Sequence, residues 1–257
     1  MPTLTDCPQS NAGEWSFRIF GVPVHVKFWF WAACLLTGAN QEETSAILIW
    51  VAVCFGSILL HELGHVCAFR LFGAEAEVVL YGWGGLAIPR RGLRGPWERL
   101  AVSLAGPAAG FCAAGLVAAA AWYAGARIHL GWYLFLPWLR AFPTVAAGAT
   151  PGTSSYLWYI LLNDLLFVNL YWGLVNLLPV YPLDGGQASG ALFEQSNPLG
   201  GRRKSLILSA AVAVAIALAG ILQKSGYIVV LFAVLAASSL QALEAERTRP
   251  GRSPQGW

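Results

Sequence analysis

Charged residues are scarce in this sequence. They make up 11% of its 257 residues, whereas apolar residues make up 57% and the mean hydropathy is +0.58. Soluble proteins carry about 25% charged residues, so this composition excludes an ordinary soluble globule and a disordered chain. The formal charge is only +3 and there is no long basic run, which excludes an electrostatic surface for nucleic acid. What remains is a protein that crosses a membrane several times.

Cysteine is also rare, and no two cysteines form a C-x-x-C pair. The five are Cys7, Cys34, Cys54, Cys67 and Cys112. Because the number is odd and four of them lie in or beside apolar runs, we predict neither a disulfide framework nor a cysteine zinc site. We interpret them as small buried apolar side chains. The first 16 residues are polar and have no cationic cluster before an apolar core, so we expect no signal peptide.

Long apolar runs are what the sequence does have. Most are near the roughly 20 residues that a helix needs to cross about 30 Å of hydrocarbon, although the first is short and contains His25 and Lys27. We predict an α-helical polytopic membrane protein with about six transmembrane helices, in a single membrane-embedded domain over 1–257 with flexible tails at 1–14 and 244–257. The predicted spans are 24–39, 46–71, 100–121, 156–181, 205–222 and 227–243.

Positive charge lies mostly on one side of the predicted membrane. With six spans and a cytosolic N-terminus, all Lys and Arg residues fall on the cytosolic side except Arg127, Arg140 and Lys224. This bias predicts that both termini are cytosolic, and we expect a prokaryotic inner membrane. The aromatic segment 128–155 fits an interfacial or re-entrant element. The alternative is a seventh span, which would put Arg140 deep in lipid.

The second predicted span ends in the motif H-E-x-x-H at 61–65. Residues four apart share one face of a helix, so His61 and His65 can direct both imidazoles at one metal ion. Glu62 can take a proton from a water molecule at that metal. The alternative is a pair of interfacial histidines with a snorkelling glutamate. Three ionisable groups in an apolar helix are costly, however, which favours a functional metal site.

A catalytic zinc site needs a third protein ligand. His129 falls on the opposite side of the predicted membrane, and His25 has no ligand motif around it. Asp184 follows the proline-broken end of the fourth span and precedes Gly185 and Gly186. The second and fourth spans run in the same direction, so their ends lie at similar depth and Asp184 is the favoured ligand. An ordinary Asp-Gly-Gly turn is the alternative.

The sequences H-E-L-G-H at 61–65 and N-L-L-P-V-Y-P-L-D-G-G at 176–186 together resemble the motifs of the site-2 protease family. These are zinc metalloproteases that cut substrates within the membrane. The resemblance covers roughly 22–186, within a core of about 22–190. It implies a three-helix catalytic core made by the second, third and fourth spans.

The resemblance also implies roles for individual residues. One zinc ion per chain would be bound by His61, His65 and Asp184, and Glu62 would be the general base. Asn176 matches the family's asparagine, which is thought to steady the substrate peptide or the oxyanion. An interhelical hydrogen bond is the alternative role for this asparagine.

Residues 74–89 have short β-branched runs around a glycine-rich middle, which predicts a short membrane-associated β-hairpin. This hairpin resembles the family's strand pair, including Gly84 and Gly85, whose free edge would hold an extended substrate by backbone hydrogen bonds. A plain loop is the alternative. The sequence departs from many relatives at Gly110, where they have Asn, and at Gln187, where Arg is frequent. We interpret Gly110 as a helix-packing glycine.

The sequence therefore predicts a metalloendopeptidase that hydrolyses peptide bonds of transmembrane substrates with a metal-activated water. Its expected partners are a transmembrane protein or peptide and the lipid bilayer, and no nucleic acid. One alternative is a catalytically silent membrane-binding relative, but such a protein usually loses a ligand or the base. The other is a metal transporter, which needs polar groups continuing to the far side. Above His61 the second span offers only Ser57 and Cys54.

Overall fold

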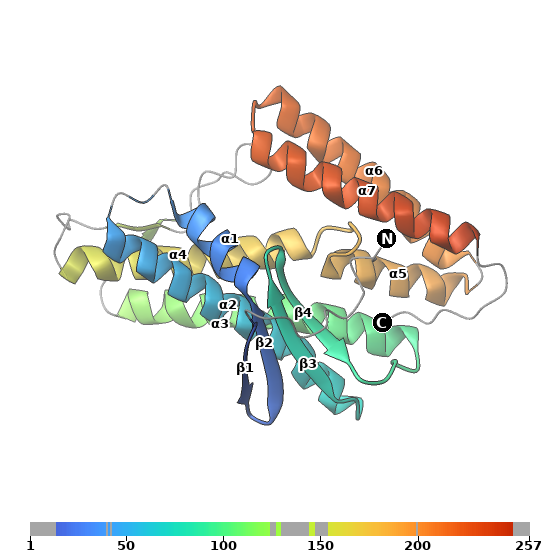
Figure 1. The fold of residues 1–257 in the computed structure, drawn as a ribbon, viewed down its shortest axis with the longest axis horizontal. Helices are drawn as coiled ribbons and strands as arrows, with labels where there is room; N and C mark the ends of the chain where they lie inside the picture. Colours follow the sequence, from blue (N-terminus) through green and yellow to red (C-terminus); the bar gives the residue numbers. More distant parts are fainter. Residues whose placement is uncertain are drawn as a thin grey trace.

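The computed structural model describes residues 14–39, 41, 43–123, 127–129, 144–146, 154–198 and 200–248. Within these ranges, five helices are long and apolar enough to cross a membrane. They are α2 (Thr44–Leu71), α3 (Pro96–Tyr123), α4 (Ser154–Asn176), α6 (Gly201–Leu222) and α7 (Gly226–Arg247) (Figure 1). The predicted spans at 46–71, 100–121, 156–181, 205–222 and 227–243 thus correspond to helices, although α4 ends at Asn176.

The first predicted span, 24–39, is wrong in its first part. Val22–Lys27 forms strand β2, and only Phe28–Gly38 is helical, as the 11-residue helix α1. Such a helix is about 16 Å long, which is short for a bilayer core of about 30 Å. The strand follows from a two-residue period of buried apolar side chains. The buried positions are Val22, Val24 and Val26.

A four-stranded sheet lies beside the helices (Figure 1). The predicted hairpin at 74–89 is confirmed as the antiparallel pair β3 (Ala76–Tyr81) and β4 (Gly84–Pro89). A second hairpin, β1 (Glu14–Ile19) and β2, joins it through parallel pairing of β2 with β3. The order is β1-β2-β3-β4, so β4 is an edge strand.

Glu14, which the sequence placed in a flexible tail, is the first residue of β1. Its carboxylate pairs with Lys27 on β2 and lies 2.7 Å from Nδ1 of His25. The hydrogen bond from Lys27 holds the pKa of Glu14 below its usual value. The rest of that predicted tail lies outside the described residues, as does 249–257. Residues 244–247, also predicted as tail, belong to α7.

Helices α2, α3 and α4 pack against one another and form the predicted three-helix core. Small residues bring α2 and α3 close together, because a Cβ at Gly64 would lie 2.6 Å from the Ala105 carbonyl oxygen. A Cβ at Gly110 on α3 would lie 3.2 Å from the Asn169 carbonyl oxygen on α4. This contact supports the interpretation of Gly110 as a packing glycine.

Helices α6 and α7 form a hairpin that contacts the core through α5 (Asp184–Ser196), an element that the sequence analysis missed. Helix α5 packs against both α3 and α6. The hairpin also holds the segment before α5, because Ser239 Oγ donates a hydrogen bond to the Tyr181 carbonyl at 3.1 Å. Val180 is fully buried among apolar residues of the hairpin. The α6–α7 hairpin therefore supports the chain just before Asp184.

The segment 128–155 is described only in part. Two short strands, β5 (Arg127–His129) and β6 (Thr144–Ala146), pair antiparallel. The sequence analysis considered an interfacial, re-entrant or spanning element here. The other residues between α3 and α4 lie outside the described ranges.

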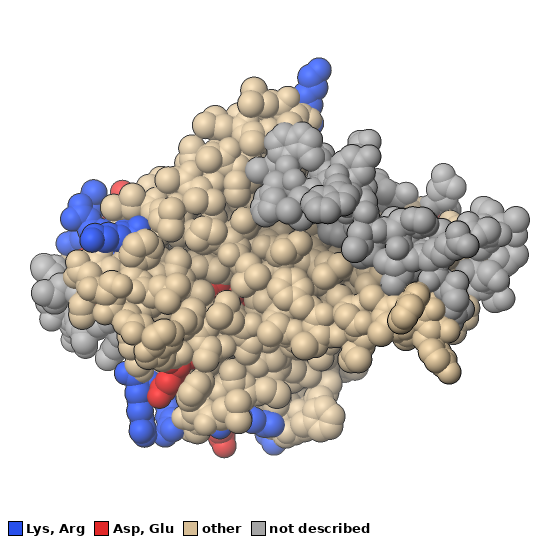
Figure 2. Space-filling model, turned by 180° about the vertical axis from the view of Figure 1, so that it is seen from behind, with Lys and Arg blue, Asp and Glu red and all other residues tan. Residues whose placement is uncertain are grey.

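The face shown in Figure 2 is mostly uncharged. Lys and Arg side chains gather at its margins, and the tan surface between them carries few charges. Large apolar side chains are exposed on several of the long helices, including Leu48, Leu116, Leu218 and Val230. Exposed apolar surface on helices of this length is what contact with lipid requires.

Candidate metal centre

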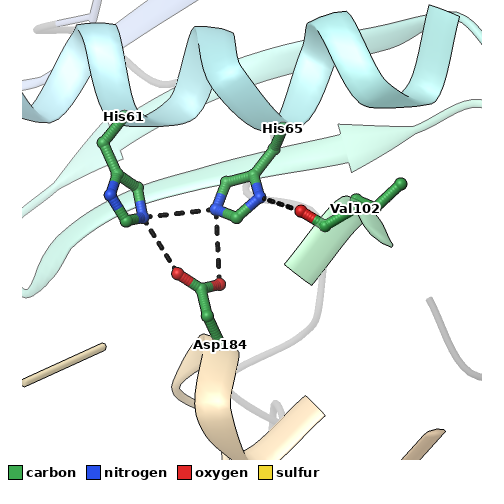
Figure 3. A network of polar contacts seen from close by, with 4 residues as sticks. All are labelled: His61, His65, Val102 and Asp184. Atoms are coloured by element: carbon green, nitrogen blue, oxygen red, sulfur yellow. Dashed lines mark hydrogen bonds and ion pairs between the residues drawn. The ribbon is translucent and has the colours of Figure 1, made fainter. Parts of the chain in front are cut away.

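Three of the predicted site residues meet at one point (Figure 3). Nε2 of His61 lies 3.0 Å from Oδ2 of Asp184, and Nε2 of His65 lies 3.3 Å from Oδ1 of the same carboxylate. The two Nε2 atoms are 3.2 Å apart. Among the described residues, this is the group of three donors whose ligand atoms lie close enough to hold a metal ion.

The spacing of these donors fits zinc. Zn²⁺ bonds to imidazole nitrogen and carboxylate oxygen at about 2.0–2.2 Å, so neighbouring donors of a tetrahedral site stand about 3.3 Å apart. The three separations of 3.0, 3.2 and 3.3 Å are close to that value. The carboxylate of Asp184 faces both imidazoles, at 3.0 and 3.3 Å. Two imidazoles and one ionised carboxylate leave a fourth position open, as in catalytic zinc sites.

The orientation of His65 is fixed from α3. Its Nδ1–H donates a hydrogen bond of 2.7 Å to the carbonyl oxygen of Val102 (Figure 3). This bond selects the tautomer whose Nε2 carries a free lone pair, which is the form that binds a metal. Metal-binding histidines usually have such an outer partner, so the contact supports a ligand role for His65.

Gly106 on α3 gives the two imidazoles their space. A Cβ at this position would overlap the ring of His65 and would lie 2.8 Å from Nε2 of His61. Gly106 therefore shapes the metal centre.

We expect Gly106→Ala to weaken metal binding strongly, because the new methyl group displaces one or both imidazoles. Misplaced support around a metal site typically costs about 10–100-fold in affinity. The measurement is competition for zinc with a chromophoric chelator. The matched control is Gly115→Ala on the same helix, where a Cβ meets no atom within 4 Å. Equal zinc affinity of the Gly106 and Gly115 variants would contradict this role for Gly106.

Glu62 lies between α2 and strand β4. It is buried, and its carboxylate faces the backbone of β4 at Gly85. A Cβ at Gly85 would lie 2.5 Å from Oε1 of Glu62. Gly85 thus permits β4 to approach the carboxylate that the sequence predicts as the general base. Gly84 lies at a φ of +133°, with the Trp172 side chain 2.6 Å from where its Cβ would stand.

Asp184 is placed by close backbone packing. It begins α5, after a segment with two prolines. A Cβ at Gly185 would overlap the Leu177 carbonyl, and a Cβ at Gly186 would lie 2.5 Å from the carbonyl carbon of Val180. The alternative of an ordinary Asp-Gly-Gly turn is wrong, because a helix begins at Asp184. The two glycines let this helix pack tightly on residues 177–180.

The remaining predicted residues are distributed as follows. Asn176 is buried at the last turn of α4, and its catalytic role stays a prediction. His25, already disfavoured as a ligand, contacts Ser16 and Glu14 on β1 instead. The structure therefore brings together His61, His65 and Asp184, and places Glu62 beside Gly85.

These features define a class of protein, namely a helical membrane protein with a His-His-Asp group that could hold a metal ion and an adjacent glutamate. Residues 49–219 match the family model described as peptidase family M50. The chain belongs to this family, and its resemblance to the site-2 protease family is confirmed.

Three curated proteins illustrate the relationship. The chain is 27% identical over 208 residues to the "Putative zinc metalloprotease sll0528" of Synechocystis, with 76% of this chain and 47% of that protein covered. It is 29% identical over 188 residues to "Stage IV sporulation protein FB" of Bacillus subtilis, with coverage of 72% and 52%. It is 25% identical over 186 residues to "Zinc metalloprotease MJ0392" of Methanocaldococcus jannaschii, with coverage of 70% and 45%. The chain spans about half the length of these relatives.

The solved structure of the "Site-2 Protease from Methanocaldococcus jannaschii" has a similar fold. The TM-score is 0.56, and 95% of this chain and 99% of that chain are covered. Sequence identity is 19%, so the comparison speaks for the shared fold alone.

Proposed function

We propose that this protein is a zinc-dependent intramembrane endopeptidase that hydrolyses peptide bonds of transmembrane substrates. The observation that carries the proposal is the convergence of His61, His65 and Asp184 from two separate helices, with Glu62 beside them. Helices long enough to span a membrane surround this group. Membership of peptidase family M50 supports hydrolysis as the reaction.

Each of these residues has a separate proposed role in hydrolysis. When bound by His61, His65 and Asp184, zinc supplies a Lewis acid that polarises the peptide carbonyl and lowers the pKa of water. Glu62 accepts a proton from the attacking water and delivers it to the leaving amide nitrogen. Val102 keeps His65 in its metal-binding tautomer. Asn176, as a donor of hydrogen bonds, is suited to hold the substrate backbone or the developing oxyanion.

The edge strand β4 is suited to hold the substrate. Proteolysis requires an extended peptide, and a transmembrane helix that unwinds loses its internal backbone hydrogen bonds. An edge strand offers replacement partners for those groups. Because Gly85 on β4 contacts Glu62, a peptide added along this strand would lie beside the general base. Gly84 and Gly85 are therefore proposed substrate-binding positions.

The charge distribution supports an orientation for the protein. Three groups of basic residues lie on one side of the predicted topology. They are the arginines at the end of the β3–β4 hairpin, those of the segment before α3, and the basic cluster at the start of α6. The positive-inside rule then supports a position of the metal centre near the cytosolic face. Water would reach the site from that side.

The first experiment measures zinc content and hydrolysis together. The full chain is reconstituted in liposomes, and the probe is a panel of quenched-fluorescent single-span peptides with a helix-weakening Gly or Asn at the centre. We expect about one zinc per chain. Chelation is expected to abolish cleavage, and added zinc to restore it, because the proposed chemistry needs the metal.

The same liposomes separate the rival functions. Zinc transport into the lumen without cleavage would favour a transporter and overturn the proposal. Bound zinc with neither cleavage of any probe nor transport would favour a catalytically silent membrane-binding protein. The retention of all three donors and of Glu62 argues for the enzyme over both rivals.

A further inference from the structure

A buried ion pair connects the two helices that flank the metal centre. Arg99, near the start of α3, pairs through its guanidinium with the carboxylate of Glu194, near the end of α5. The Glu194 side chain is 4% exposed and that of Arg99 is 14% exposed. Charged groups are almost never this buried unless they are paired, and the sequence analysis did not single out either residue.

Both partners are linked to the metal centre through short stretches of helix. Arg99 stands one turn before Val102, whose carbonyl accepts the hydrogen bond from His65. Glu194 lies on the same short helix that Asp184 begins. The ion pair therefore joins the helix that orients one ligand to the helix that carries another.

A small pocket of about 20 Å³ lies beside the pair, and its lining includes Arg99, Glu194, Arg202 and Gln187. This volume has room for about one water molecule. A directional, charge-assisted hydrogen bond restricts relative movement of two helices more than apolar contacts do.

We propose that Arg99 and Glu194 are a positioning pair for the metal centre: they fix α5 against α3 so that Asp184 meets His61 and His65. The inference rests on the proposed zinc function and adds a determinant of that site. Helix α5 is also tied to α6, because Ser189 Oγ and Ser205 Oγ form a hydrogen bond of 2.9 Å. Helix α5 is thus held against both α3 and α6, and the ion pair fixes its contact with α3.

The test measures zinc affinity and the absorption spectrum of the Co²⁺-substituted protein, in detergent and without any substrate. We expect Glu194→Ala and Arg99→Ala to lower zinc affinity by about 10-fold or more and to change the Co²⁺ spectrum, since loss of outer support costs about 10–100-fold. The matched control is Glu14→Ala, which breaks another ion pair of low exposure, with Lys27 on the β1–β2 hairpin. It is expected to keep wild-type affinity and spectrum.

Single variants leave an unpaired buried charge and can fail to fold. The double variant Arg99→Leu with Glu194→Leu removes both charges, and such apolar replacements of buried pairs are often neutral for stability. We expect this variant to fold and still to bind zinc weakly, with an altered Co²⁺ spectrum. Wild-type affinity and spectrum in the folded double variant would overturn the positioning role. Absence of zinc binding by the wild type would instead overturn the proposed function.

Discussion

Replacement of Glu62 by Gln is expected to abolish peptide hydrolysis while zinc remains bound. Gln has nearly the same size as Glu, so the contact with Gly85 and the packing under β4 are retained. It cannot accept a proton from water, and general acid–base catalysis contributes about 10²–10⁴-fold to such reactions. None of the three proposed metal ligands is changed. Cleavage and zinc content are measured on the same reconstituted sample.

The control for this prediction is Glu75→Gln, the same chemical change at an exposed carboxylate next to β3. It is expected to leave both cleavage and zinc unchanged. Cleavage by the Glu62 variant above a tenth of the wild-type rate would remove Glu62 as the general base. Loss of zinc from the variant would show that Glu62 also helps to bind the metal.

The second large effect is expected from Asp184→Ala. This change removes the ionised donor and leaves only the two imidazoles, which cannot complete the three-ligand set of a catalytic site. Zinc affinity should fall by at least about 100-fold, and hydrolysis should fall with it. The measurement is chelator competition followed by metal analysis of the purified protein.

Asp184→Asn separates charge from shape. The amide keeps the size of the side chain and still presents one oxygen toward His61, but it carries no negative charge. We expect intermediate or weak zinc retention from this variant. Unchanged metal content in both Asp184 variants would remove Asp184 from the ligand set.

The parts of the site that could be predicted are those that depend on local spacing. His61 and His65 share a helix face because they are four residues apart, and the apolar runs around them predicted α2 and α3. The pairing with Asp184 needed a topological argument, since 123 residues separate it from His61. That argument works because the two spans run in the same direction.

Other features depend on contacts that no local pattern reveals. The first predicted span was assigned by apolar content, and the alternation of Val22, Val24 and Val26 was given too little weight. Helix α5 was missed because Gly185 and Gly186 are poor helix formers, and tight tertiary packing overrides that preference. The space that Gly106 gives the imidazoles appears only when α3 lies against α2, so a sequence alone presents it as one more small residue.

The distance along the chain between the donors also governs when the site can exist during synthesis. A nascent chain that has been made only as far as α4 already holds both histidines and the glutamate, yet it lacks the carboxylate at the start of α5. The set of three donors is complete only after α5 has been synthesised. The donors come together only after α5 has docked on α3. The metal centre is thereby a late product of folding, absent from partly made chains.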